Sequence, residues 1–312
     1  MSRPHRSPEG FRRSMQMSAT RVFVLVEGKR TDPFFYAELA GSVCEAAGLS
    51  YEIVRANLFG DGGGKQILSK LYEYLQANKS LSDRTKGAPS LCVFYLDKDV
   101  DDILRDLIRS PHVVYTPFYT VENTLFVHGE LVKAAAAAAS LEVAAIRARI
   151  PDNGAWLREK AEQWKDFVVL CLLSRKNSLN CDCNYGCNTS PLNYPPEAPT
   201  DKVAVLARKA ELQVRLGLPA ERFERKFRAA ARLIDRIYRS GQHGVVFNGK
   251  WYRGLLVREI ELAAGGQEYD KSSLANSLIS ALRASLDFNA GWADHFKDPL
   301  RELIKVEMSA AA

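Results

Sequence analysis

The sequence predicts an α/β fold, a parallel sheet flanked by helices, followed by an α-helical domain. In the first 130 residues, short β-branched and aromatic runs alternate with segments of helical apolar spacing. Such alternation indicates βαβ units and a parallel sheet. Beyond residue 130 the strand signal stops and helical patterns continue. The chain has 312 residues, 46% hydrophobic and 26% charged, which is enough apolar material for one large domain or two ordinary ones.

The first domain is predicted over residues 21–130, after a polar, Arg-bearing segment, residues 1–20, that we expect to be a flexible arm. Continuous apolar runs are typical of buried parallel strands. The expected strands are residues 21–26, 51–58, 91–96 and 113–118. The helices expected between them are residues 32–47, 65–77 and 101–108.

The second domain, residues 131–312, is predicted to be helical and contains a Pro- and Cys-bearing loop at residues 177–200. Its helices are expected at residues 131–150, 154–173, 203–216, 221–239, 252–264 and 272–286. Within the loop, Cys181, Cys183 and Cys187 are spaced C-x-C-x₃-C, which matches the paired halves of structural zinc sites poorly. A zinc site and a surface loop with reduced thiols are both left open.

The composition also bears on compartment and partners. No run of about 18 apolar residues could span a membrane, and no apolar stretch follows the N-terminal arginines as a secretory signal requires. Six cysteines in a chain of this length indicate reduced thiols. We therefore expect a cytoplasmic protein without a membrane partner. The net charge of +6 is compatible with nucleic acid but does not require it.

Acidic side chains follow the first and third predicted strands. Glu27 and Gly28 come after the first, and Asp97 and Asp99 after the third. Because parallel strands end at one edge of a sheet, these carboxylates are expected to converge and to need a cation. Oxygen ligands without His or Cys favour Mg²⁺ or Mn²⁺, which suits phosphodiester cleavage. For Asp101 and Asp102 the alternative is that they cap the next helix.

Two further strand ends carry candidate residues. A glycine loop, residues 60–64, leads to Lys65, which could contact a phosphate or simply be a solvated lysine after a tight turn. The loop is one residue too short for a P-loop, and Gln66 replaces its Ser or Thr. After the fourth strand, Glu122 is a candidate third metal ligand or a helix cap, and Asn123 could hold the loop.

The helix predicted at residues 221–239 has two faces. One is an apolar stripe of Phe223, Phe227, Ala230, Ile234 and Ile237. The other is a row of arginines: Arg225, Arg228, Arg232, Arg236 and Arg239. The arginines could follow a nucleic-acid backbone or pair with neighbouring acids. Downstream, Lys250 beside Trp251 and Tyr252 could offer a cation and a stacking surface, or the two aromatics could be ordinary core.

These motifs resemble a known family. Residues 24–28 (VLVEG) with Asp32, followed by residues 94–99 (FYLDKD), resemble the Toprim domain of topoisomerases, primases and OLD-type nucleases. Residues 63–65 (GGK) and 119–123 (YTVEN) are most similar to the OLD-like branch, which includes the AriB-type effectors of PARIS antiphage systems. The resemblance covers residues 20–130, with a weaker echo at Gly249-Lys250.

The resemblance implies a divalent-metal-dependent endonuclease in which Glu27, Asp97 and Asp99 bind metal and carry strand cleavage. It further implies a role in antiphage defence, an RNA substrate (tRNA in particular) with DNA as the alternative, and an ABC-type ATPase partner, with a homodimer as a candidate active state. The Val-Asp-Asp that follows Asp99 departs from topoisomerases and primases. Two other readings stay open: a non-catalytic Toprim-shaped interaction module, and a haloacid-dehalogenase-like phosphatase with Asp97 as nucleophile.

Overall fold

The computed structural model describes residues 5–29, 31–83, 89–179, 181–185, 201–265 and 269–309, and the chain divides into two compact units. The α/β unit comprises Met1–Asp97, Leu107–Pro117 and Asp287–Ala312. The helical unit comprises Lys98–Asp106 and Phe118–Leu286. The predicted fold class is confirmed: an N-terminal, mostly parallel sheet with flanking helices is followed by a large helical region.

The sheet has the order β2-β1-β4-β3, and β5 also pairs with β4. Its strands are β1 (Val22–Val26), β2 (Tyr51–Arg55), β3 (Ser82–Asp83), β4 (Ser90–Leu96) and β5 (Val113–Tyr115). All pairs are parallel except β3 with β4. The register of β1 and β4 ends with Val26 opposite Tyr95, so both strands deliver their next residues to the same edge.

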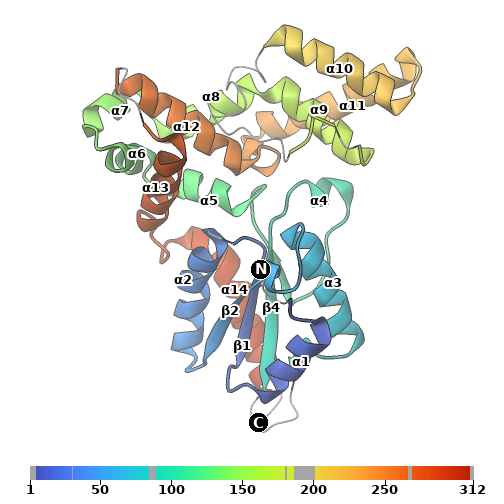
Figure 1. Cartoon of the computed structure of the whole chain (residues 1–312), viewed down its shortest axis with the longest axis vertical. Helices are drawn as coiled ribbons and strands as arrows, with labels where there is room; N and C mark the ends of the chain where they lie inside the picture. The colour runs from blue at the N-terminus through green and yellow to red at the C-terminus, as the bar shows by residue number, and fades with distance from the viewer. Residues whose placement is uncertain are drawn as a thin grey trace. The chain divides into compact units, whose positions relative to one another are not determined.

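Helices cover both faces of the sheet (Figure 1). On one face, α1 (Pro8–Met17) and α3 (Gly64–Ala77) share a buried cluster with alternate residues of β1 and β4, among them Phe23 and Phe94. On the other, α2 (Thr31–Ala46) and α14 (Asp294–Ser309) pack together, and the ring of Tyr36 stacks on Tyr95 with 4.5 Å between centroids. Because every residue of β1 is buried, the strand has no polar face, as its sequence predicts.

The N-terminal segment is a correction to the sequence prediction. Residues 8–17 form α1 rather than part of a flexible arm. Ser7 caps this helix by accepting the Gly10 N–H at 3.0 Å, and Pro8 stands in its first turn, where its missing N–H costs nothing. Phe11 and Met15, one turn apart, are fully buried. Two apolar residues at this spacing are too few to reveal an amphipathic helix by periodicity.

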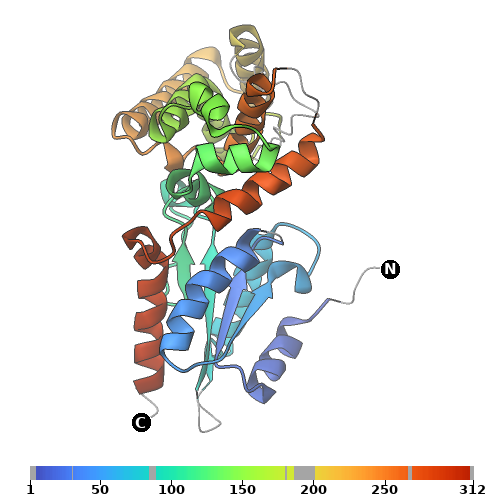
Figure 2. The ribbon, with the colours of Figure 1, turned by 90° about the vertical axis from the view of Figure 1, so that its left-hand side faces the viewer.

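The C-terminal segment corrects the predicted boundary between domains. Residues 287–312 belong to the α/β unit, not to the helical unit, whereas Phe118–Leu286 belong to the helical unit. Helix α14, the dark red helix beside the sheet in Figure 2, packs on α2 and β4. The Tyr95 hydroxyl donates to the carbonyl of Phe296 at 3.0 Å. This second cover for the sheet comes from the far end of the chain.

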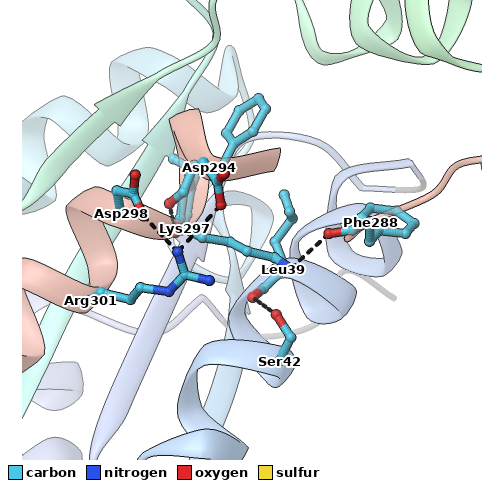
Figure 3. A network of polar contacts seen from close by, with 9 residues as sticks. Leu39, Ser42, Phe288, Asp294, Lys297, Asp298 and Arg301 are labelled. Atoms are coloured by element: carbon cyan, nitrogen blue, oxygen red, sulfur yellow. Dashed lines mark hydrogen bonds and ion pairs between the residues drawn. The ribbon is translucent and has the colours of Figure 1, made fainter. Parts of the chain in front are cut away.

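Polar contacts anchor α14 and its approach (Figure 3). The buried Lys297 ammonium donates to the Phe288 carbonyl at 2.7 Å. On the exposed side, Arg301 contacts Asp294 at 3.3 Å and Asp298 at 2.6 Å. In the adjacent helix α2, the Ser42 hydroxyl donates to the Leu39 carbonyl at 2.9 Å.

The helical unit is built around aromatic side chains such as Trp164, Trp251 and Tyr252, which are buried. Its longer helices are α5 (Val121–His128), α6 (Leu131–Ala139), α8 (Asn153–Gln163), α9 (Lys165–Lys176), α10 (Lys202–Leu216), α11 (Ala220–Arg239), α12 (Gly249–Ala263) and α13 (Lys271–Ala284). The short elements are α4 (Asp101–Leu104), α7 (Val143–Arg149) and the 3₁₀ turn His243–Val245.

Several predicted boundaries shift. The second predicted strand ends at Arg55, where a 3₁₀ turn follows, and the fourth ends at Tyr115. The helix predicted at residues 131–150 is interrupted at Ser140, whose φ of 54° is left-handed, so it becomes α6 and α7. No helix in the described part of the chain is both long and apolar enough to cross a membrane.

Candidate active site

Glu27 and Asp97 meet at the carboxyl edge of the sheet in the α/β unit. Each directly follows a central strand, Glu27 after β1 and Asp97 after β4. The Asp97 backbone N–H donates to Glu27 Oε1 at 2.7 Å. Both residues are half-buried. The parallel pairing of the two strands therefore brings together two acids that are 70 residues apart in sequence.

Asp32, which belongs to the Toprim-like motif but was not among the predicted metal ligands, is a third acid at this edge. It lies in the first turn of α2 with only 6% of its surface exposed, and its Oδ2 accepts the Gly28 N–H at 2.7 Å. A Cβ on Gly28 would overlap this carboxylate, so a larger residue there would displace the Asp32 side chain. The spacing Glu-Gly-x₃-Asp was the available signal: a turn that folds back on itself brings residues four apart into contact.

The field at this edge is negative. Burial raises the pKa of the Tyr36 phenol well above its ordinary value, and the carboxylates of Asp32, Asp97 and Glu27 raise it further. All three carboxylates therefore act on the same phenol. Such a group favours a cation among its neighbours.

The start of α3 packs directly against Glu27. A Cβ on Gly64 would lie 2.5 Å from the Glu27 carbonyl oxygen and 3.0 Å from its Cα. The helix has no side-chain cap, so its positive end is not neutralised by a capping residue. Lys65, in the first turn, lies with its ammonium 5.9 Å from the centre of the Tyr115 ring. Lys65 therefore belongs to the same unit as Glu27 and follows the glycine that contacts it.

Asp99 lies in the helical unit with a left-handed φ of 52°, which is uncommon outside glycine. Its N–H donates to the Tyr119 carbonyl at 2.8 Å. Burial raises the pKa of the Tyr119 phenol well above its ordinary value, and Asp99 adds to the rise. Asp101 and Asp102 stand in the first turn of α4, where acids are favourable, but the N-cap is Val100, so neither occupies the predicted cap position. Asp101 is buried, with one oxygen 3.5 Å from the Arg175 guanidinium.

Glu122 and Asn123 stand in the first turn of α5, also in the helical unit. Thr120 and Asn123 form a capping box, so Glu122 is not the cap. Fully buried Asn123 Oδ1 accepts from the N–H groups of Thr120 and Gly249 at 3.0 Å each, and its Nδ2 donates to the Phe247 carbonyl at 2.9 Å. Asn123 therefore holds the loop, as predicted. Glu122 Oε2 is shielded from solvent and has no hydrogen-bond partner among the described residues.

The arginine row of α11 is exposed along its length, which its periodicity predicted. The arginines in question are Arg225, Arg228, Arg232, Arg236 and Arg239. The opposite face is buried through Phe223, Ala230, Ile234 and Tyr238. Lys250 is exposed at the start of α12, but Trp251 and Tyr252 are each 1% exposed. The stacking surface proposed beside Lys250 is therefore wrong, and these aromatics belong to the core.

The cysteines of the predicted loop are partly described. Cys181 and Cys183 are free thiols, as the alternative to zinc expected, but they are buried rather than at the surface, and Cys187 lies outside the described residues. Burial raises the pKa of the Cys183 thiol to about 12, which disfavours the thiolate that zinc requires. Among the described residues, no group of three or more His, Cys, Asp or Glu side chains is arranged so that it could hold a metal ion.

Comparison with protein-family models and with curated proteins finds no match to the chain. The functional proposal below therefore rests on the residues themselves and on the family resemblance of their motifs.

Proposed function

We propose that this protein is a Toprim-type endonuclease that depends on Mg²⁺ or Mn²⁺ and cleaves RNA, tRNA in particular. The observation that carries the proposal is the meeting of Glu27 and Asp97 at the ends of two adjacent parallel strands, with 2.7 Å between Glu27 Oε1 and the Asp97 nitrogen. The Toprim resemblance assigns its metal-binding glutamate and its Asp-x-Asp pair to these strand ends.

The α/β unit supplies oxygen ligands of the kind that a hard cation prefers. Glu27 and Asp97 offer carboxylates at adjacent strand ends, and Mg²⁺ keeps several waters and takes only one or two carboxylates from a protein, so a preformed group of three side chains, which the described residues lack, is not required. When bound, such an ion would activate water and stabilise the leaving oxygen of a phosphodiester. Asp99 and Glu122, the other ligands proposed from sequence, lie in the helical unit.

The protein's own groups supply phosphate binding. Lys65, in the first turn of α3, carries a positive charge and three N–H donors, which suit a phosphate oxygen. The uncapped N-terminus of α3 favours anions at the same place. In this proposal Glu27 and Asp97 hold the ion, Lys65 orients the phosphate that is cleaved, and the arginines of α11 and Lys250 bind the rest of the substrate.

The biological setting is proposed from the resemblance alone. It comprises a cytoplasmic effector of antiphage defence that an ABC-type ATPase partner controls, with a homodimer as the active form. A gene for an ABC-type ATPase next to the gene for this protein would support the proposed partner.

The first experiment measures metal binding and cleavage by the full chain. Mn²⁺ binding is measured by isothermal titration calorimetry for the wild type, Glu27→Gln and Asp97→Asn. Glu52→Gln, at an exposed position of β2, is the control. We expect both site variants to lose Mn²⁺ binding and RNA cleavage, and the control to keep both. Unchanged Mn²⁺ binding in Glu27→Gln would refute the assignment.

Toxicity gives a second measurement that allows for gating by a partner. We expect induced expression with the ATPase partner and its trigger to arrest bacterial growth, and Glu27→Gln to abolish the arrest. Arrest by both chains would contradict the proposal. A phosphatase that uses Asp97 as its nucleophile would instead hydrolyse a small phosphate ester, would lose this activity in Asp97→Asn and would keep it in Glu27→Gln.

A further inference from the structure

The positive charge of the chain is concentrated in one helical hairpin. Residues 202–239, which comprise α10, α11 and their connection, contain eleven Lys and Arg against four Asp and Glu, a net charge of +7. The whole chain has a net charge of +6, so the remainder is close to neutral. A segregated charge of this size is the electrostatic footprint of a polyanion site.

Within the hairpin, the arginines of α11 form a straight row. At 100° per residue, Arg225, Arg228, Arg232, Arg236 and Arg239 fall within a sector of about 80°, and at 1.5 Å per residue they extend over about 21 Å. Each of the five is exposed. The row therefore presents a series of guanidinium groups along one line, at intervals of about one helical turn.

The charge of this row is not cancelled by the acids of its own helix. Glu224 pairs with Lys209 of α10 at 2.7 Å, and Asp235 pairs with Lys165 of α9 at 2.7 Å. These two of the three acids of α11 are therefore turned toward the neighbouring helices, and the third, Glu221, is exposed in the first turn. Within the described residues, no carboxylate forms an ion pair with the five arginines, so the row is a solvated face, as the alternative considered from sequence expected, but without its pairing to acids.

The exposed arginine face of α11 lacks the aromatic side chains that bind single-stranded nucleic acids. Proteins that bind unpaired bases stack them on aromatic side chains, whereas duplexes are held through their phosphates. The aromatics of α11 are on its other side: Phe223 and Tyr238 are buried and Phe227 is half-buried, its ring 4.0 Å from the Lys209 ammonium. The exposed row offers phosphate binding without base stacking.

We infer that the arginine row of α11 binds the backbone of a base-paired nucleic acid, independently of its sequence. This inference deepens the proposed function and rests on it, because it names double-stranded segments of RNA as the part of the substrate that the helical unit holds. Each arginine that contacts a phosphate releases counterions, so the row predicts a strong dependence of affinity on salt.

The experiment measures binding by fluorescence anisotropy with the full chain in EDTA, so that neither metal nor cleavage enters. The probes are a 20-base-pair RNA duplex and a single strand of the same length without base pairing, each from 50 to 200 mM KCl. The variants are Arg225→Gln/Arg228→Gln/Arg232→Gln/Arg236→Gln and the milder Arg232→Gln/Arg236→Gln. Arg147→Gln, an exposed arginine of α7 in the same unit, is the control.

We expect the wild type to bind the duplex at least about tenfold more tightly than the single strand. Each lost phosphate contact should lower the slope of log K against log salt by about 0.9, so the quadruple variant should lose about 3.6 and the double variant about 1.8. The control should match the wild type. Equal affinity for both probes, or an unchanged slope in the quadruple variant, would overturn the inference.

The two proposals fail separately. If the chain binds the duplex through these arginines but neither binds Mn²⁺ nor cleaves RNA, the nuclease proposal fails and this inference stands as a binding function. If it cleaves RNA while the arginine variants bind and cleave as the wild type does, only this inference fails.

Discussion

Gly64→Ala tests whether close packing of α3 against the β1 turn positions Glu27. The added Cβ would lie 2.5 Å from the Glu27 carbonyl oxygen and 3.0 Å from its Cα. Both are backbone atoms, so no side-chain rotation can relieve the overlap. Gly63, the preceding residue, provides a matched control, because a Cβ there meets nothing within 4 Å and its φ of −68° suits any L-residue.

The magnitude follows from the displacement required. Ordinary carbon contacts are about 3.5–4.0 Å, so helix and turn must separate by several tenths of an ångström or more. Overpacking of this kind costs about 1–3 kcal/mol, and the better helix propensity of Ala returns at most about 1 kcal/mol. We therefore expect a net destabilisation of about 1–2 kcal/mol, or a melting temperature lower by about 2–8 °C. Gly63 is the N-cap of α3, where Ala is less favourable than Gly, so Gly63→Ala should cost no more than about 1 kcal/mol and should leave Glu27 in place.

The same displacement bears on activity. A movement of Glu27 lengthens its 2.7 Å contact with the Asp97 nitrogen, and a shift of about 1 Å in a catalytic group costs about 100-fold in rate. The assay is urea unfolding and RNA cleavage of both alanine variants beside the wild type. If Gly64→Ala is as stable and as active as Gly63→Ala, the reasoning from contact geometry is refuted.

Three further predictions concern buried polar groups of the helical unit. Glu259 lies 3.0 Å from both Lys160 and Arg149, so Glu259→Gln should cost about 2 kcal/mol in urea unfolding, whereas equal stability would show that the pairs contribute nothing. Burial raises the pKa of Glu259, but hydrogen bonds and charge from Lys160 and Arg149 outweigh it and the net shift is downward. The stability difference between wild type and Glu259→Gln should therefore hold above about pH 5 and shrink as the pH falls below about 4; a constant difference would contradict the lowered pKa. Asn123→Ala leaves several buried groups unpaired, among them the Gly249 N–H, and should lower the free energy of unfolding by about 3–5 kcal/mol. A decrease of less than about 1 kcal/mol would contradict this prediction.

How far the sequence predicts this fold depends on how local each signal is. The strands at residues 22–26 and 90–96 are found because burial on both faces requires unbroken apolar runs, and this requirement is visible without knowing the partner. Helix α1 is missed because only two of its ten residues are buried. The helix is held by the tertiary contacts of Phe11 and Met15 with the core, and these contacts leave no hydrophobic periodicity in a segment that is otherwise polar.

The domain boundary fails for a topological reason. After β4 the chain leaves the α/β unit at Lys98, returns at Leu107 to add β5, leaves again at Phe118 and returns at Asp287. Composition changes along the chain only once, near residue 130, where strands cease. A single change of composition cannot predict a unit that is assembled from three separate segments. The sequence of a helix such as α14 also does not indicate which of the two cores the helix covers.

The candidate site was predictable to the extent that the sheet assembles it. Strand ends that meet at one edge brought Glu27 and Asp97 into the same prediction. Asp32 was noted only as part of the motif, because its contact with the Gly28 N–H depends on a turn. Glu27 accepts a main-chain N–H, and this donor exists whatever residue follows β4. The Glu27 carboxylate is thus tied to the register of β1 and β4, with Val26 opposite Tyr95, through this main-chain contact. A slip of one residue in this register would turn the side chains of one strand to the opposite face, so this fold cannot form correctly while its acidic edge is misassembled.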